Sequence, residues 1–311
     1  MGLLFWLLIL IASLYFLVKS SDYLVISAEK IGYYFRLSPI IIGTTILAFG
    51  TSLPELITSL FAVFKNSTEI IIGNVIGSNI ANILFVLGIA VFLTKRFRIK
   101  GSVGDTTMLL IASIFLILTT IDGYFTLMDG ITGIILFIIY LIRVKRSHDR
   151  HLETVDLTNN EKKLDKKTTP MFITSIIAIY FSAEYTITSV IELSKLLNIG
   201  TEVLAASVIA LGTSLPEVMV SVAAAKKNKL SLALGNVVGS NIFNILLVMG
   251  IPALITNLAI PDNIIFLGIP FFIISTLMFY QTFKDKIMTR NEGYMYLGVY
   301  ALFLILLYTR F

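Results

Sequence analysis

The sequence predicts an all-α integral membrane protein with ten transmembrane helices. They are expected to form two inverted five-helix repeats, with helices broken near the midplane of the membrane. The 311-residue chain is 57% hydrophobic and 14% charged, with a mean hydropathy of +0.91, whereas soluble domains carry about a quarter charged residues. Its apolar blocks are long enough to cross a bilayer, which takes about 20 residues. One polar hexapeptide also occurs twice inside these blocks.

Ten apolar blocks are expected to span the membrane. They cover residues 2–27, 38–64, 68–94, 105–120, 125–144, 171–194, 200–225, 230–257, 262–282 and 291–309. The first block has no basic residue before Lys19, so it is interpreted as a retained span, since secretory signals begin with basic residues. The long polar stretch after the fifth span is expected to be a solvated linker. The predicted organisation is therefore a first repeat at 1–144, a linker at 145–170 and a second repeat at 171–311.

The basic residues predict the orientation in the membrane. If the loops alternate between the two sides, one side receives all but three of the 24 Lys and Arg residues, the exceptions being Lys65, Lys195 and Arg310. Basic loops remain in the cytoplasm, so both termini are expected outside the cell membrane and the linker inside. The net charge of +5 then reflects topology and not nucleic-acid binding. Cysteine is absent, which excludes disulfides and thiolate metal sites.

The duplicated hexapeptide is Gly-Thr-Ser-Leu-Pro-Glu, found at Gly50–Glu55 and at Gly212–Glu217. The offset of 162 residues (217 minus 55) also aligns Asn82 with Asn244 without a gap. Each half contains five expected spans, an odd number, so the second half enters the membrane from the opposite side. This arrangement is typical of transporters built from inverted repeats.

Each hexapeptide places a carboxylate within an apolar span. Glu55 and Glu217 have no intramembrane Lys or Arg partner, and an unpaired charge at this depth is costly. Pro54 and Pro216 lack the backbone N–H that closes a helical turn, so they are expected to interrupt the helices and free nearby carbonyl oxygens. Hard cations such as Ca²⁺ and Na⁺ bind oxygen ligands, so the hexapeptides predict an ion site whose two buried carboxylates need cations or protons.

Thr51 or Ser52 is expected to cap the helix that resumes after the first interruption. A second duplicated segment, Gly73–Leu84 and Gly235–Leu246, agrees at ten of twelve positions. Its polar residues recur every four positions and so share one helical face. These residues are Asn74, Ser78 and Asn82 in the first copy and Asn236, Ser240 and Asn244 in the second. Helix packing alone is the alternative explanation, but it does not account for the glutamates nearby in both halves.

The two hexapeptides, each followed by the Gly-Asn and Gly-Ser-Asn-Ile segment, resemble the α-repeats of the cation/Ca²⁺ exchanger superfamily, most closely the prokaryotic Na⁺/Ca²⁺ exchangers. The resemblance covers nearly the whole chain. It implies electrogenic exchange of several Na⁺ for one Ca²⁺ by alternating access, with spans 2, 3, 7 and 8 forming the site and spans 1 and 6 sliding across them. The implied ion ligands are Ala48, Thr51, Ser52, Glu55, Ser78 and Asn82, and Ala210, Thr213, Ser214, Glu217, Ser240 and Asn244.

Asn244 departs from the family pattern, which often has Asp at this position of the second repeat. The departure leaves two acids, so three Na⁺ would give the site one excess positive charge. Protonation of Glu55 and Glu217 could replace Na⁺ binding, because burial favours the neutral carboxyl group. A Ca²⁺/H⁺ antiporter of the same superfamily is therefore the main alternative.

Functions from other classes fit less well. A cation channel can also use acidic residues, but channels usually build a pore by oligomeric symmetry. An enzyme is not expected, because the chain has no HExxH or GxSxG motif and no intramembrane His. We expect no cofactor and no nucleic-acid partner, only Ca²⁺, Na⁺ or H⁺ and the lipid bilayer, and a functional monomer. The acids near the ends of the first and sixth spans are expected to face water, namely Asp22, Glu29, Glu184 and Glu192.

Overall fold

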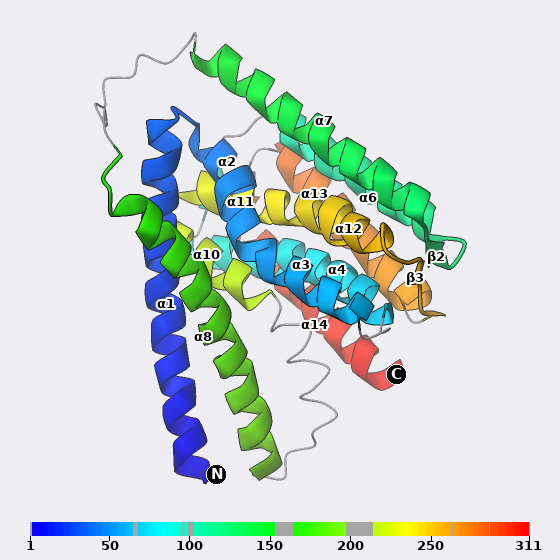
Figure 1. Ribbon diagram of the computed structural model, residues 1–311, viewed down its shortest axis with the longest axis horizontal. Helices are drawn as coiled ribbons and strands as arrows, with labels where there is room; N and C mark the ends of the chain where they lie inside the picture. Colours follow the sequence, from blue (N-terminus) through cyan, green and yellow to red (C-terminus); the bar gives the residue numbers. More distant parts are fainter. Residues whose placement is uncertain are drawn as a thin grey trace.

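A computed structural model of the chain describes residues 2–64, 68–94, 96–98, 103–152, 164–196, 214–262, 264–285 and 287–310. Helices account for nearly all of this (Figure 1). Within the described ranges, each of the ten expected spans contains a helix. Seven helical stretches there are long and apolar enough to cross a membrane, and Thr106–Thr120 is a shorter apolar helix. These features support a multi-pass membrane protein.

The first half starts with α1 (Leu3–Tyr34). A continuous helical rod follows, made of α2 (Pro39–Ile42), the π-helical turn η1 (Gly43–Leu47) and α3 (Ala48–Phe64). The next rod consists of α4 (Glu69–Ala81), the π-helical turn η2 (Asn82–Val86) and α5 (Leu87–Thr94). Strand β1 (Arg96–Arg98), α6 (Val103–Thr120), strand β2 (Tyr124–Phe125) and α7 (Leu127–Leu152) complete this half.

The second half contains α8 (Thr168–Leu196), α10 (Leu215–Lys226) and a rod of α11 (Leu230–Phe243), η3 (Asn244–Val248) and α12 (Gly250–Ala253). It continues with β3 (Leu258–Ala259), η4 (Ile264–Gly268), α13 (Ile269–Asp285), β4 (Ile287–Thr289) and α14 (Arg290–Arg310). The expected seventh span, residues 200–225, is described only from Ser214 onward.

The strand pairs reveal the symmetry of the two halves. β1 pairs with β4, and β2 pairs with β3, both antiparallel. At the offset of 162 residues, β1 corresponds to β3 and β2 overlaps β4. Each small sheet thus joins one strand from each half. The symmetry that relates the two halves maps the β1–β4 sheet onto the β2–β3 sheet. Because α6 separates β1 from β2 along the chain, the sheets lie at opposite ends of the bundle. The predicted inverted repeat is confirmed.

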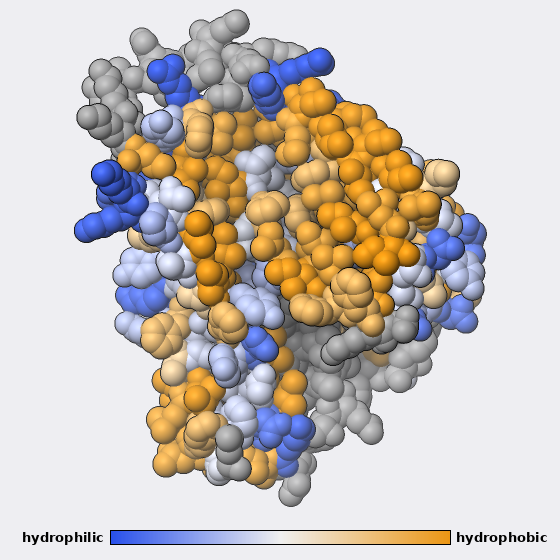
Figure 2. All heavy atoms as spheres, viewed as in Figure 1, coloured by the Kyte–Doolittle hydropathy of each residue, from blue (hydrophilic) through white to orange (hydrophobic). Residues whose placement is uncertain are grey.

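The interior and perimeter of the bundle differ in the way expected for a protein in lipid. Every residue of α11 from Leu232 to Phe243 is buried, whereas α1, α7 and α13 expose large apolar side chains such as Leu4, Met128 and Leu277. Figure 2 shows hydrophobic residues over the face formed by α7 and hydrophilic residues toward the rim. Such large exposed apolar surfaces are typical of contact with a membrane. α1 and α8 pack side by side at one flank of the bundle (Figure 1).

The interruption in the first half takes a different form from the one expected. α3 continues through Pro54 as an internal residue, so neither Thr51 nor Ser52 caps a helix. Pro54 has no backbone N–H to donate to the preceding turn, yet the helix continues through it. The π-helical turn η1 precedes α3 in the same rod. In the second half, α10 does begin within the hexapeptide, with Pro216 in its first turn. Ser214 occupies the N-cap position there but makes no capping hydrogen bond.

Candidate functional site

The two predicted carboxylates lie deep in the bundle and close together. Glu55 on α3 is 2% exposed, and Glu217 in the first turn of α10 is fully buried. Their carboxyl groups are near enough to interact electrostatically. Among the described residues, none is a hydrogen-bond partner of either oxygen of Glu55 or of the Oε2 of Glu217. Unpaired buried charges and close like charges are both unfavourable. The pair is therefore expected to bind a cation or a proton.

Each hexapeptide contacts residues of the opposite half. Ser52 Oγ donates a hydrogen bond to Glu217 Oε1 at 3.0 Å. Thr51 Oγ1 donates to Asn236 Oδ1 at 3.3 Å and lies 3.3 Å from Ser240 Oγ, both on α11. The two halves therefore build one site, in which hydroxyl and amide groups surround the carboxylates.

Buried amide groups form a second layer at the π-helical turns. Asn82 and Asn244 are the first residues of η2 and η3, and both are fully buried. Asn82 Nδ2 donates to Asn241 Oδ1 at 3.1 Å, and Asn241 Nδ2 donates to the carbonyl of Asn79 at 3.4 Å. Neither the Oδ1 nor the Nδ2 atom of Asn244 has a hydrogen-bond partner. π-Helical turns occur frequently at functional sites, and here the repeat places one at each of these asparagines.

Ten of the twelve predicted ligand residues lie in the described ranges, and all ten are buried. They are Ala48, Thr51, Ser52, Glu55, Ser78, Asn82, Ser214, Glu217, Ser240 and Asn244. The hydrogen bonds bring Thr51 to Ser240 and Ser52 to Glu217, whereas Ser78 Oγ donates to Asn74 Oδ1 within its own helix at 3.4 Å. Ala210 and Thr213 lie outside the described residues.

Sequence reasoning missed Asn241. It bonds to Asn82 from the opposite half, yet it lies one residue beyond the polar stripe that contains Ser240. The signal was present, because Asn79 and Asn241 are identical residues at the 162-residue offset in the duplicated segment.

The acids at the ends of the long helices behave differently on α1 and α8. The expectation of water contact is wrong for Glu29, which is buried and forms an ion pair with Lys229. Asp22 Oδ1 lies 2.7 Å from Lys227 Nζ. Both lysines belong to the turn between α10 and α11, which packs against α1 and so covers Glu29.

The acids on α8 follow the expectation more closely. Glu184 is exposed, and Glu192 pairs with the exposed Lys195 at 2.6 Å. Elsewhere in the part of the chain that is described, no cluster of three or more His, Cys, Asp or Glu residues could hold a metal ion. The candidate site is accordingly a pair of acids supplemented by neutral oxygen atoms.

Comparison with known proteins identifies the family. The family described as sodium/calcium exchanger protein matches residues 5–145 and 167–309. The chain belongs to the sodium/calcium exchanger family. This exchanger is 30% identical to the sodium/calcium exchanger MaX1 of Methanosarcina acetivorans, over 97% of this chain and 98% of that protein. It is also 34% identical to an uncharacterized membrane protein of Methanocaldococcus jannaschii, over 92% of each chain.

The fold comparison agrees. A solved structure of the sodium-calcium exchanger NCX_Mj, soaked with Na⁺ and Sr²⁺, superposes on this exchanger with a TM-score of 0.83 at 30% identity, covering 98% of each chain. The resemblance noted in the sequence is thereby confirmed. The protein is an exchanger-type antiporter of the membrane, from a family of transporters.

Proposed function

We propose that this exchanger moves Ca²⁺ across the membrane in exchange for Na⁺, binding both ions at the carboxylates of Glu55 and Glu217. The main support is that two glutamates from opposite halves share one buried site, in which three of their four oxygens have no hydrogen-bond partner within the described part of the chain. Two ionised carboxylates balance the charge of one Ca²⁺. The printed names of MaX1 and NCX_Mj, both sodium/calcium exchangers, agree with this choice of ions.

Neutral oxygens complete the proposed coordination, because Ca²⁺ takes about six to eight oxygen ligands. The proposed set comprises Ala48, Thr51, Ser52, Ser78, Asn82, Ser214, Ser240 and Asn244, together with Ala210 and Thr213. Ser52 Oγ donates a hydrogen bond to Glu217 Oε1 in this structure. A carboxylate oxygen has a second lone pair, so Oε1 can keep this bond and still bind an ion.

Alternating access is the proposed mechanism. The long helices α1 and α8 are the first helices of the two repeats and pack against one another along their length. As a pair they can slide across the core that holds both glutamates and thereby open the site to one side or the other. One chain supplies both halves of the site, so a monomer suffices. In this scheme residues 1–144 and 171–311 are the two repeats, and 145–170 is their linker.

The proposed orientation places both termini outside and the linker in the cytoplasm. Introduced cysteines report this directly, because the chain has none of its own. Ser147→Cys should resist an impermeant thiol reagent in intact cells, and Gly123→Cys, on the opposite side, should react. The reverse pattern would overturn the proposed orientation.

The decisive experiment is Ca²⁺ uptake into proteoliposomes, driven separately by a Na⁺ gradient and by a pH gradient. Uptake with the Na⁺ gradient alone supports the proposed exchange. An electrogenic reaction should also respond to an imposed membrane potential. No uptake with either gradient, from protein that is folded and inserted, would contradict antiport of Ca²⁺ by this chain.

Ca²⁺/H⁺ antiport is the second candidate, and the composition of the site favours its consideration. Asn244 supplies no charge, and two protons would neutralise the glutamate pair as fully as one Ca²⁺ does. Uptake driven by the pH gradient and independent of Na⁺ would establish this alternative.

A further inference from the structure

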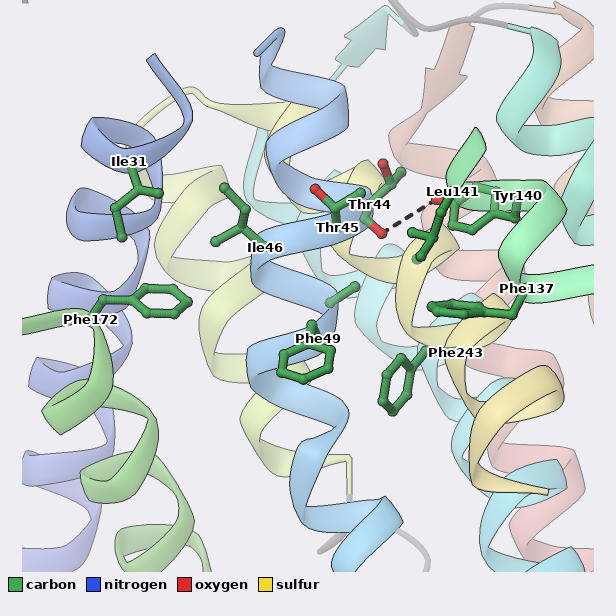
Figure 3. Close-up of a pocket in the computed structure, with 12 residues that line it drawn as sticks. Ile31, Thr44, Thr45, Ile46, Phe49, Phe137, Tyr140, Leu141, Phe172 and Phe243 are labelled. Atoms are coloured by element: carbon green, nitrogen blue, oxygen red, sulfur yellow. Dashed lines mark hydrogen bonds between the residues drawn. The ribbon is translucent and has the colours of Figure 1, made fainter. Parts of the chain in front are cut away.

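A lateral cavity of about 480 Å³ opens beside the glutamate site. It lies across η1 and the start of α3, between Ile31 and Phe172 of the α1–α8 pair and Phe137 and Leu141 of α7 (Figure 3). Its volume falls in the range of about 300–1,000 Å³ that is usual for ligand pockets. All four of these helical segments belong to membrane-spanning stretches, so the cavity is at membrane depth.

The cavity has few polar groups that could bind a water molecule. Its polar side chains come from Thr44, Thr45 and Tyr140. The hydroxyls of both threonines donate to the carbonyl of Ile41, at 3.3 and 2.6 Å. Tyr140 OH donates to the carbonyl of Thr44 at 3.3 Å (Figure 3). Because a buried water needs about two to four polar partners, an apolar occupant is favoured.

Basic residues surround the end of the bundle nearest the cavity. The C-terminal ends of α1 and α7 and the N-terminal end of α8 lie at the same end of the molecule (Figure 1). Exposed basic side chains gather on these ends, namely Arg36, Arg143, Lys145, Arg146, Lys166 and Lys167. Phe172 is five residues from Lys167, and Leu141 is two from Arg143, so about 3–8 Å of helix separates the cavity from this basic rim at 1.5 Å per residue.

We propose that the cavity binds one acyl chain of an anionic phospholipid whose phosphate headgroup rests on the basic rim. The surrounding bilayer supplies acyl chains at the mouth, where Phe49 and Leu141 are exposed. Basic clusters at a membrane surface attract anionic headgroups. The bound chain lies between the α1–α8 pair and α7, next to the η1 turn that precedes the Glu55 site.

The test uses phosphatidylglycerol that carries a photoactivatable diazirine in the middle of one acyl chain. After irradiation of proteoliposomes, the labelled residues are mapped by mass spectrometry. Tyr140 and Phe243 line the cavity but are each only 2% exposed, so bulk lipid does not reach them. We expect label on both, with Phe272, buried outside the cavity, unlabelled and the lipid-facing Leu277 labelled as a reference.

Two tryptophan variants provide a matched control. Leu141 lines the cavity mouth and is 42% exposed, whereas its neighbour Ile142 is 47% exposed and does not line it. Leu141→Trp should remove most label from Tyr140 and Phe243, and Ile142→Trp should leave it unchanged. Phosphatidylcholine with the same chain should label both residues less than phosphatidylglycerol does.

The labelling pattern does not depend on which ions are exchanged, so it tests this proposal separately from transport. Label confined to lipid-facing residues such as Leu141 and Leu277 would overturn the acyl-chain site. Equal labelling of Tyr140 and Phe243 by the two lipids would overturn the role of the basic rim.

Discussion

The two hexapeptides have identical sequences but different surroundings. Glu217, of the second copy, accepts a hydrogen bond from Ser52 of the first. The reciprocal contact is missing, because Ser214 Oγ and both oxygens of Glu55 have no hydrogen-bond partner in the ranges that the structure describes. The helices differ as well, since α3 passes through Pro54 while α10 starts at Leu215. A symmetric sequence has therefore produced an asymmetric site.

The proposed alternating access would account for this asymmetry. Two halves related by inverted symmetry can exchange their conformations when the protein turns from one side of the membrane to the other. A single conformation must then show the two copies in different states. We expect the Ser52–Glu217 bond to be replaced by a Ser214–Glu55 bond in the opposite state. The following predictions test how far the two copies are equivalent.

The largest effect is expected from neutralising either glutamate. Glu55→Gln and Glu217→Gln should each abolish Ca²⁺ uptake, because a charge pair at 4 Å contributes about 4 kcal/mol at an effective dielectric of 20. That energy corresponds to about a thousandfold in affinity. Isotopic Ca²⁺ uptake measures the loss, and Glu69→Gln, at an exposed acid of α4, is the matched control. Near-normal uptake by one variant alone would show that the copies are not equivalent.

The next effect concerns the ion pair between Glu29 of α1 and Lys229, because the acid of this pair has no sequence counterpart in α8. At the 162-residue offset, Ile191 takes the place of Glu29. Lys229→Met should destabilise the protein by about 3 kcal/mol, because it leaves the buried Glu29 without its counter-charge. Lys227→Met should cost less than about 1 kcal/mol, since Asp22 is partly exposed. Thermal unfolding in detergent compares the two.

A second substitution tests whether the unpaired charge causes this loss. Glu29→Gln in the Lys229→Met background should recover most of the lost stability, because it removes the unpaired charge, while Met keeps an apolar stem of similar length to that of Lys. Failure to recover would mean that the loss comes from the missing ammonium group of Lys229 and not from an unpaired charge on Glu29.

A smaller effect distinguishes the two serines. Ser52→Ala should lower the stability of the ion-free protein by about 1.5 kcal/mol, the contribution of a hydrogen bond to a charged group. Ser214→Ala should change it little, because the Ser214 hydroxyl has no partner in this state. Thermal melts without Ca²⁺ and Na⁺ measure both, and equal losses would contradict the asymmetry.

The smallest effect on Ca²⁺ transport is expected at Asn244. In the proposed site the pair of glutamates already neutralises Ca²⁺, so Asn244→Asp should retain exchange. Its new carboxyl group, near two others, should make transport pH-sensitive in the neutral range. Asn82→Asp is the matched comparison and should impair transport more, because a carboxylate cannot donate to Asn241 Oδ1 as the Asn82 amide does. Complete loss in Asn244→Asp at every pH would show that Asn244 is an irreplaceable ligand.

The sequence by itself determined the membrane class, the inverted repeat and the two glutamates. These follow from hydropathy, from exact duplication and from charge at membrane depth, all of which are properties of one segment or of two aligned segments. The burial of ten predicted ligands in one bundle agrees with that analysis. The continuous helix through Pro54 was not predictable, because packing against neighbouring helices outweighs the local preference for a break.

Only the tertiary structure decided which identical residue meets which partner. Ser52 and Glu217 are 165 residues apart, and the sequence pattern fits Ser214 with Glu55 equally well. The same holds for Glu29 with Lys229, and for the lateral cavity, whose walls come from five helices. Such contacts depend on how helices that are distant in the sequence pack against one another. A repeat fixes the set of possible partners, and the packing of one conformation selects among them.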